Sequence, residues 1–225
     1  MAAVLGLYRS SIGKKVVMAL TGFVLVGFVI AHMVGNLKAF QGPEKLNAYG
    51  VFLRDVGGPI FGHEQLLWIV RLVLLASVVL HIVAAVQLAR GELAARPVRY
   101  AYHKKVQATY ASRTMRWGGM IILLFVIYHL LHFTVGSAHP SFRSGDIYHN
   151  LVSGFQVWYV SAFYIAAMIA LGLHLYHGVW SMFHTLGLNN RTYNRLLRGT
   201  AAVVAGAVAL GNISIPVAVL VGWIK

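Results

Sequence analysis

The chain contains five long runs of apolar residues, and these runs limit what it can fold into. They lie at about Val16–Leu37, Leu66–Ala89, Trp117–Val135, Val157–Phe183 and Thr200–Ile224. A helix needs roughly 20 consecutive apolar residues to cross the hydrocarbon core of a bilayer, whereas a spanning strand needs about 10. Lipid offers no hydrogen bonds to the backbone, so runs of this length favour helices. The sequence therefore predicts an all-α integral membrane protein, a five-transmembrane-helix bundle forming one domain over residues 1–225.

The composition excludes several classes of function. Charged residues make up only 11% of the chain and hydrophobic residues 59%, which excludes a soluble globular domain. The chain has no cysteine, so disulfides, thiolate-bound zinc, iron–sulfur clusters and covalently attached haem are excluded as well. Five acidic residues are too few to favour carboxylate-rich metal cages or paired-carboxylate hydrolases. The eleven histidines remain as the main source of chemistry.

The basic residues predict how the helices are oriented. Thirteen of them lie in the amino-terminal segment and in the second and fourth connections, against five in the other connections and at the carboxyl end. The positive-inside rule then places the amino terminus in the cytoplasm and the carboxyl terminus outside. The first run has no cleavage site after it and is expected to stay as an anchor. In the first outer connection, Gly57-Gly58-Pro59 predicts a turn before the second span.

Histidines inside the apolar runs are the second informative feature. Six lie within the predicted spans: His32, His81, His129, His132, His174 and His177. Ionisable residues inside a membrane are costly and indicate function, although an interhelical hydrogen bond explains any single one equally well. At about 1.5 Å per residue, one histidine lies roughly two-thirds along each of the first four spans. Successive helices run in opposite directions, so His32 and His129 fall together in the outer half of the membrane. His81 and His174 likewise fall together in the inner half.

Two facing imidazoles at each level predict two haem b groups. Haem iron takes axial imidazole and needs no cysteine when the haem is bound noncovalently, whereas zinc would require three or four ligands at one point. We therefore expect His32 and His129 to ligate the iron of an outer haem. We expect His81 and His174 to ligate the iron of an inner haem.

Spacing alone leaves the ligand choice open in two helices. His129 and His132 lie three residues apart, as do His174 and His177, so the members of each couple could share a helix face. The more even match in depth favours His129 and His174.

Four further residues are candidates to bind haem propionates. Arg71 lies at roughly the depth of His32 and could pair with a propionate of the outer haem, although snorkelling to the interface explains it equally well. Ser112, Arg113 and Arg116 open the third helix and could serve the inner haem. Positive-inside anchoring is the plainer explanation for any one of these three.

A family resemblance runs over about Ser10–Gly187. It is carried by Ser10–Lys15, Thr21-Gly22 through His32–Leu37, Arg71-Leu72 through His81, Ser112–Arg116 through His129, and His174–Gly178 through Gly187. These stretches resemble the cytochrome b membrane-anchor subunit of succinate dehydrogenase and fumarate reductase, in its single-chain, five-helix, two-haem variety. The resemblance implies the same four haem ligands and the same pairing of helices. Gly178 matches a family glycine four residues after the ligand, which favours His174 over His177.

The resemblance also implies a role and partners. Electrons from succinate would pass through a flavoprotein subunit holding FAD and an iron–sulfur subunit, cross two haems and reduce a quinone, with menaquinone expected. The chain would be the electron-transfer subunit of that enzyme in a bacterial cytoplasmic membrane, contacting lipid and no nucleic acid. Whether the whole complex forms a higher oligomer stays open. So do three alternatives, namely a quinol:fumarate reductase anchor, another di-haem cytochrome b, and a non-redox transporter.

The quinone is expected to react near the outer haem. An outer haem is superfluous if quinone is reduced at the inner face, and quinone reduction needs groups that deliver protons. The candidates are Asn36, His63, Glu64 and His132. For each of them, an interface residue without a catalytic task is the plainer explanation. A rival inner site would use Ser11, Arg116 and His184.

The basic cytoplasmic face is expected to dock the catalytic subunits. Complementary charge favours orientation and encounter rate more than affinity. Charge reversal at Arg99, Lys104 and Lys105 is predicted to weaken assembly while leaving both haems bound.

Overall fold

The computed structural model describes residues 8–95, 98 and 110–225, and this part of the chain is helical, without strands. The elements in order are α2 (Ser11–Asn36), a 3₁₀ turn (Leu37–Gln41), α3 (Pro43–Asp55), α4 (Gln65–Ala94), α5 (Tyr110–His129), a π-helical turn (Leu130–Val135), α6 (Ile147–Gln156), α7 (Trp158–Thr185) and α8 (Asn194–Leu220). Five of these helices are long and apolar enough to cross a membrane: α2, α4, α5 with the π-helical turn, α7 and α8. The predicted all-α membrane fold with five spans is confirmed.

The helices extend beyond the apolar runs at several ends. The run predicted to end at Ala89 belongs to a helix that continues to Ala94, and the run predicted to begin at Trp117 belongs to one that begins at Tyr110. Hydropathy marks only the part of a helix that lies in hydrocarbon. A helix can continue into the polar interface, where charged side chains are solvated. At the carboxyl end α8 stops at Leu220, before a turn in which Gly222 has φ 75°.

The helices α3 and α6 lie in the first and third connections between spans, which were expected to be the outer ones, and these two helices were not predicted. Helix α3 begins after Gly42, whose φ is 92°, with Pro43 in its first turn. At the start of α6 the Asp146 carboxylate accepts a hydrogen bond from the backbone N–H of His149 at 3.1 Å. The Asn47 side chain joins the two helices: its amide nitrogen donates to Asp146 at 3.0 Å, and its oxygen accepts from the backbone of Tyr148 at 3.0 Å.

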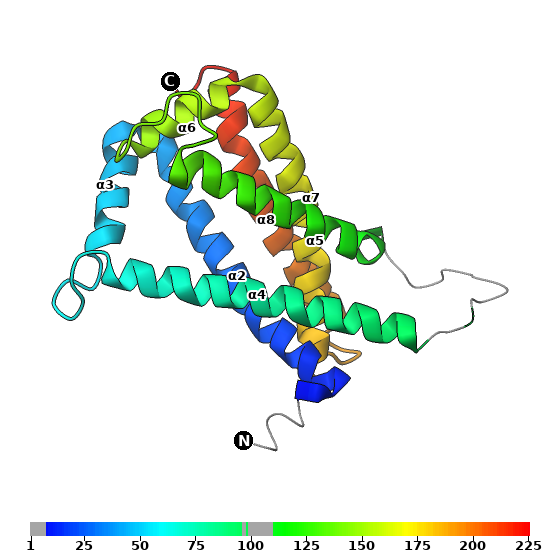
Figure 1. The fold of residues 1–225 in the computed structure, drawn as a ribbon. Coiled ribbons are helices and arrows are strands. Elements are labelled where there is room, and N and C mark those ends of the chain that lie inside the picture. Colours follow the sequence, from blue (N-terminus) through cyan, green and yellow to red (C-terminus); the bar gives the residue numbers. More distant parts are fainter. Residues whose placement is uncertain (1–7, 96–97, 99–109) are drawn as a thin grey trace.

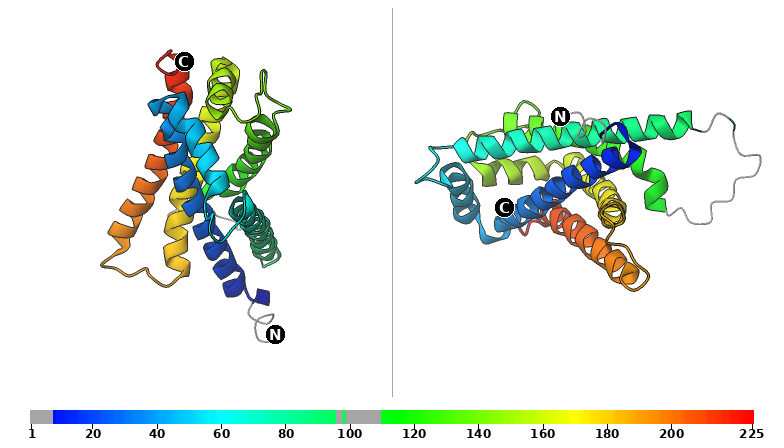
Figure 2. Two further views of the ribbon diagram at one scale, coloured as in Figure 1. Left: turned by 90° about the vertical axis from the view of Figure 1, so that its left-hand side faces the viewer. Right: turned by 90° about the horizontal axis from the view of Figure 1, so that it is seen from below.

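The spanning helices differ in how much surface they bury against one another. Helices α7 and α8 lie side by side, α2 contacts both, α4 lies against α2 and α5 lies against α7 (Figures 1 and 2). Among the described residues, α4 buries only Ser77 and Ala84, and α5 only Ala111 and Phe125. Both helices leave many large hydrophobic side chains exposed, among them Trp68, Leu72 and Ile121, as expected of surfaces that face lipid.

The two ends of the bundle carry different elements. The start of α2 and the connection between α7 and α8 lie at one end, opposite the carboxyl terminus and α6 (Figures 1 and 2). Helices α4 and α5 run across α7 and α8 at a steep angle in these views, so the chain does not simply alternate in direction through the bundle as the depth argument for the histidines assumed (Figures 1 and 2).

Candidate haem sites

His32 and His129 lie next to each other although they belong to the first and third spans. Their ring centroids are 5.8 Å apart and the ring planes are nearly perpendicular, at 87°. The ring of His32, on α2, stacks on Phe28 one turn earlier at 5.3 Å and is exposed. The side chain of His129, on α5, is half-buried. The structure therefore brings together the two residues expected at the outer level.

His81 and His174 form a second pair from the second and fourth spans. Their ring centroids are 6.4 Å apart at an interplanar angle of 59°, and both side chains are half-buried. Each ring faces a glycine of another spanning helix. A Cβ at Gly22 of α2 would lie 3.5 Å from the His81 ring, and one at Gly119 of α5 would lie 3.7 Å from the His174 ring. These glycines leave the two rings with little side-chain bulk around them.

The spacing of both pairs fits axial ligation of one iron by two imidazoles. A metal–imidazole bond is about 2 Å long, so two axial rings have their centres roughly 6 Å apart. Within the described residues no group of three or more histidines, cysteines or acidic residues is placed to hold a metal ion. Each pair therefore offers two nitrogen ligands, the number that haem iron takes from a protein.

An apolar groove adjoins the outer pair. It measures about 370 Å³ and lies between α2 and α4. Its lining is entirely apolar: Val24, Gly27, Phe28, Ala31, Ile69, Val70, Val73 and Leu74. Phe28, which stacks on His32, forms part of this lining. A flat apolar ring system could be accommodated beside His32, so the residues present fit a haem.

The hydrogen bonds of Thr21 define which nitrogen of His81 is free. The Thr21 hydroxyl donates to the backbone oxygen of Val17 at 2.7 Å, and its oxygen lies 3.2 Å from Nδ1 of His81. A hydroxyl has one hydrogen, so the oxygen must accept from Nδ1–H of His81. We therefore assign the His81 proton to Nδ1, which leaves Nε2 available to a metal, the usual arrangement of a ligating histidine.

The structure distinguishes His129 from His132, although both contact the same hydroxyl group. Tyr164 Oη lies 3.0 Å from Nδ1 of His132 and 3.4 Å from Nδ1 of His129. His132 lies in the π-helical turn that follows α5 and is fully buried. Its ring stacks on His139 at 4.8 Å. Only His129 of the two has a ring beside His32.

Two of the quinone candidates, His63 and Glu64, meet in the connection between α3 and α4. His63 is exposed, and its Nδ1 lies 2.6 Å from Asp55 Oδ1. Glu64 Oε1 lies 3.1 Å from Nε of Arg54 and 3.9 Å from Nε2 of His63. Glu64 has a left-handed backbone, with φ 61°, which is uncommon for a residue other than glycine and occurs at functional sites. The predicted turn is present, with φ 88° at Gly57.

The remaining quinone candidates lie elsewhere. Asn36 is the last residue of α2 and is half-buried. His132 belongs to the buried cluster around Tyr164 and is closed to solvent. Of the rival inner residues, Ser11 is the exposed first residue of α2, and the ring of His184 lies 4.5 Å from Trp180.

The propionate candidates are placed as follows. The Arg71 guanidinium is exposed and lies over the ring of Trp68, 4.8 Å from its centroid. Arg116 forms an ion pair with Glu92 at 2.9 Å, with both side chains about 60% exposed or more, so the pair contributes little to stability. Ser112 is half-buried and Arg113 exposed in the first turn of α5. The residues expected to dock partners, Arg99, Lys104 and Lys105, lie outside the described residues.

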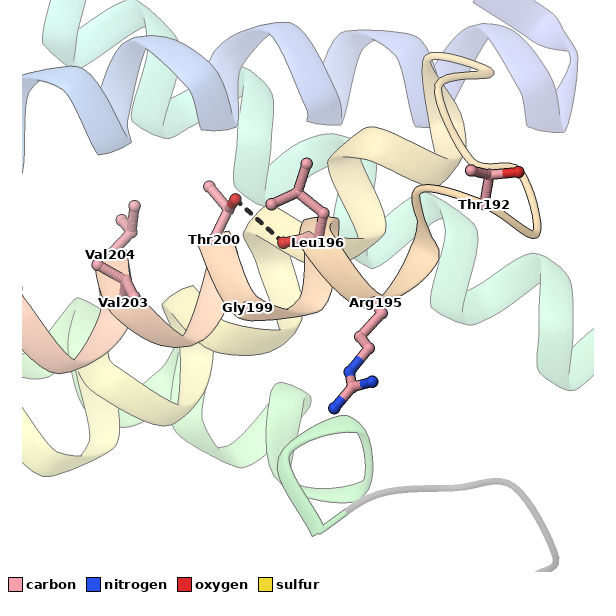
Figure 3. Close-up of a pocket in the computed structure, with 7 residues that line it drawn as sticks. All are labelled: Thr192, Arg195, Leu196, Gly199, Thr200, Val203 and Val204. Carbon is pink, nitrogen blue, oxygen red and sulfur yellow. Dashed lines mark hydrogen bonds between the residues drawn. The ribbon is translucent and has the colours of Figure 1, made fainter.

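A larger cavity contains none of the predicted site residues. It measures about 660 Å³ and lies on α8 and the residues just before it (Figure 3). Its lining is Thr192, Arg195, Leu196, Gly199, Thr200, Val203 and Val204. Figure 3 shows the Thr200 hydroxyl bonded to the backbone oxygen of Leu196, and no histidine among the lining residues.

Fold and histidine pairs together define a multi-pass helical membrane protein suited to bind haem between its spans. The family model of the succinate dehydrogenase/fumarate reductase transmembrane subunit matches residues 92–213, more than half of the chain. The chain belongs to this family, whose members are cytochrome b membrane subunits associated with the other subunits of the complex. The matched region includes His129 and His174 but begins after His32 and His81. Comparison with curated proteins gave no match, nor did comparison with solved structures.

Proposed function

We propose that this chain is the di-haem subunit that carries electrons from an iron–sulfur partner to quinone in a succinate:quinone oxidoreductase. The observation that carries the proposal is the pairing of four histidines from four spans, with ring centroids 5.8 Å and 6.4 Å apart. Haem, when bound, supplies one-electron chemistry that no side chain of this composition supplies. Family membership supports partner subunits of the same complex, and the iron–sulfur clusters must lie in a partner because this chain has no cysteine.

Each pair of histidines would hold one haem b. His32 and His129 would provide the axial nitrogens at the outer level, and His81 and His174 those at the inner level. The groove between α2 and α4 would shield the outer site from water, because its lining is apolar. Arg71, Ser112, Arg113 and Arg116 are the proposed propionate partners.

The partners would dock on the cytoplasmic side of a bacterial cytoplasmic membrane. The exposed arginines Arg191 and Arg195 precede or begin α8, at the same end as the start of α2. An excess of basic residues at one end favours the cytoplasm. Under this orientation the amino terminus is cytoplasmic, and the carboxyl terminus, α3 and α6 are outside.

Quinone, with menaquinone expected, would react at the outer end. The grouping of Asp55, His63 and Glu64 supports this position, because two protons must reach a quinone for each pair of electrons. Hydrogen-bonded carboxylates and imidazole at the water interface can supply them. Asn36 and His132 stay in the proposed set as residues at the same end of their helices.

The test is to purify the chain with its partners and to quantify haem as the pyridine haemochrome. We expect two b-type haems per chain, both reduced on addition of succinate. A colourless complex would contradict the proposal, as would a single haem per chain. Identification of the co-purified subunits by mass spectrometry tests the partners independently of the haem count.

A further inference from the structure

One histidine of each pair is held by a hydroxyl group from another spanning helix. Thr21 of α2 lies 3.2 Å from Nδ1 of His81, and Tyr164 of α7 lies 3.4 Å from Nδ1 of His129. In the part of the chain that the structure describes, the other two histidines have no such bond. His32 stacks on Phe28, and the buried Nδ1 of His174 has no hydrogen-bond partner among the described residues. The two pairs are therefore alike: in each, a hydroxyl group from another helix orients one of the two imidazoles.

The direction of the Thr21 bond follows from its own backbone contact. The hydroxyl hydrogen is used by the backbone oxygen of Val17 at 2.7 Å, the shorter of two such contacts; Met18 O is 3.2 Å away. The oxygen then serves as the acceptor for His81. Thr21 is buried, with 8% of its surface exposed, so water competes little for this oxygen.

The direction of the Tyr164 bond depends on its contact with His132. One hydroxyl hydrogen cannot serve two Nδ1 atoms, so at least one of the two histidines must donate to Tyr164. The contact with His132 is the shorter, at 3.0 Å against 3.4 Å. If Tyr164 donates to His132, its oxygen accepts from Nδ1–H of His129, and Nε2 of His129 is free of a proton.

Neighbouring rings hold His132 in position to accept the hydrogen bond from Tyr164. Its ring lies between Tyr128, at 5.4 Å, and His139, at 4.8 Å, in two stacked contacts. His139 is itself fixed, because its Nε2 donates to the backbone oxygen of Asn150 at 2.8 Å and its Nδ1 accepts from the backbone of Ser141 at 3.0 Å. The π-helical turn that carries His132 is of a kind frequently found at functional sites.

We propose that Thr21 and Tyr164 are positioning residues for the two haem sites: each oxygen accepts a hydrogen bond from Nδ1–H of one ligand and holds that imidazole with Nε2 free for iron. His132 fixes the direction of the Tyr164 bond. This inference rests on the proposed di-haem function. It assigns roles to three residues that do not touch the iron.

Loss of such a bond has a defined consequence. A hydrogen bond from the second nitrogen raises the basicity of a ligating histidine, and its removal typically costs about 10- to 100-fold in metal affinity. A less basic ligand stabilises ferric iron less, so the midpoint potential of that haem rises. The effect is local, since Thr21 contacts His81 and Tyr164 contacts His129.

The test uses two variants and two matched controls in the purified complex. Thr21→Val and Tyr164→Phe remove the hydroxyls. Thr200→Val removes a hydroxyl with the same kind of backbone bond, to Leu196 O at 3.1 Å, on a helix face without histidine. Tyr159→Phe removes an exposed hydroxyl on α7. Haem release to an acceptor protein and spectroelectrochemical titration of each haem are the two measurements.

We expect Thr21→Val to weaken binding of the inner haem by about 10- to 100-fold and to raise its potential, with the outer haem unchanged. Tyr164→Phe should do the same to the outer haem alone. Thr21→Ser should restore wild-type values, and both controls should leave both haems unchanged. Where Tyr164→Phe does not assemble, His132→Leu takes its place and should raise the outer potential alone, because Tyr164 loses its acceptor.

Two results would overturn the inference. In one, both haems are bound in every variant and their affinities and potentials match the wild type. In the other, each variant shifts both haems equally, as a general loosening of the bundle would. Neither result bears on the di-haem function itself, which fails only if the wild-type complex lacks two haems.

Discussion

His81 and His174 lie with their ring centroids 6.4 Å apart, one on the second spanning helix and the other on the fourth. Their proximity requires both helices to present the histidine at the same depth and toward the same side of α2, which contacts both helices. His32 of α2 and His129 of α5 form the second close pair, with ring centroids 5.8 Å apart. Under the proposed di-haem function, the two pairs would form a path along which electrons cross the membrane.

Charge reversal at Arg191 and Arg195 should weaken assembly with the soluble subunits. Both side chains are exposed at the basic end of the bundle, where complementary charge would steer the partners. The measurement is co-purification over a range of salt concentrations, with haem content as the check on folding. Lys45→Glu, an exposed position on α3 at the other end, is the matched control. Equal assembly of both variants would argue against docking at the basic end.

Replacing Glu64 by Gln together with His63 by Ala should abolish quinone reduction. Succinate oxidation by a soluble dye should persist, because the dye takes electrons before they reach the outer end. The reason is the loss of the two groups that contact Asp55 and Arg54 and could deliver protons. Glu44→Gln, an exposed acid in the first turn of α3, should leave both activities unchanged. Full quinone turnover in the double variant would place the quinone site elsewhere.

Stability should fall in acid as Asp146 takes up a proton. The hydrogen bond from the backbone of His149, and next the one from the Asn47 side chain, hold the pKa of this carboxyl below its usual range. A depressed pKa in the folded state gives stability that is complete above the unfolded pKa of about 3.9 and is lost as pH falls through the folded pKa.

The comparison is with Asp146→Asn, since asparagine is as good a helix cap but does not titrate. Thermal unfolding in detergent should show the wild type losing its advantage over Asp146→Asn as pH falls below about 4. A difference between the two melting temperatures that is the same at pH 7 and pH 3 would contradict this account of the cap.

Gly154→Ala should destabilise the outer end of the bundle. A Cβ there would lie 2.9 Å from Cε1 of His132 and 3.1 Å from Nε2 of His139, so both stacked rings would have to shift. Overpacking of this kind costs about 1–3 kcal/mol. Gly206→Ala in α8, where a Cβ would meet nothing within 4 Å, is the control and should melt no earlier than the wild type. Equal melting temperatures for Gly154→Ala and the wild type would show that the rings of His132 and His139 can shift at little energetic cost.

The spans and the histidine pairs could be predicted because both follow from length along a helix. A bilayer has a fixed thickness, so the position of His81 or His174 in its run gives an expected depth and an expected partner. The helices of the outer connections could not be found by hydropathy. Their signals were local: Pro43 in a first helical turn, and Asp146 as a helix cap.

The contacts of Thr21, Tyr164 and His139 had no signal in the sequence. A threonine in an apolar helix usually bonds to its own backbone, as Thr21 also does, so its second contact with His81 depends on how two helices pack. The same applies to Tyr164, which contacts His129 and His132 at the point where a π-helical turn follows α5. Spacing in sequence describes one helix at a time and leaves such contacts undetermined.

The most direct test of the central claim is redox titration of four single variants, each with one histidine replaced by alanine. His32→Ala and His129→Ala should lose the same haem, and His81→Ala and His174→Ala should lose the other, while the remaining haem keeps its potential. His177→Ala should keep both. Loss of one and the same haem in His32→Ala and His81→Ala, with the other haem intact, would contradict the pairing on which the account rests.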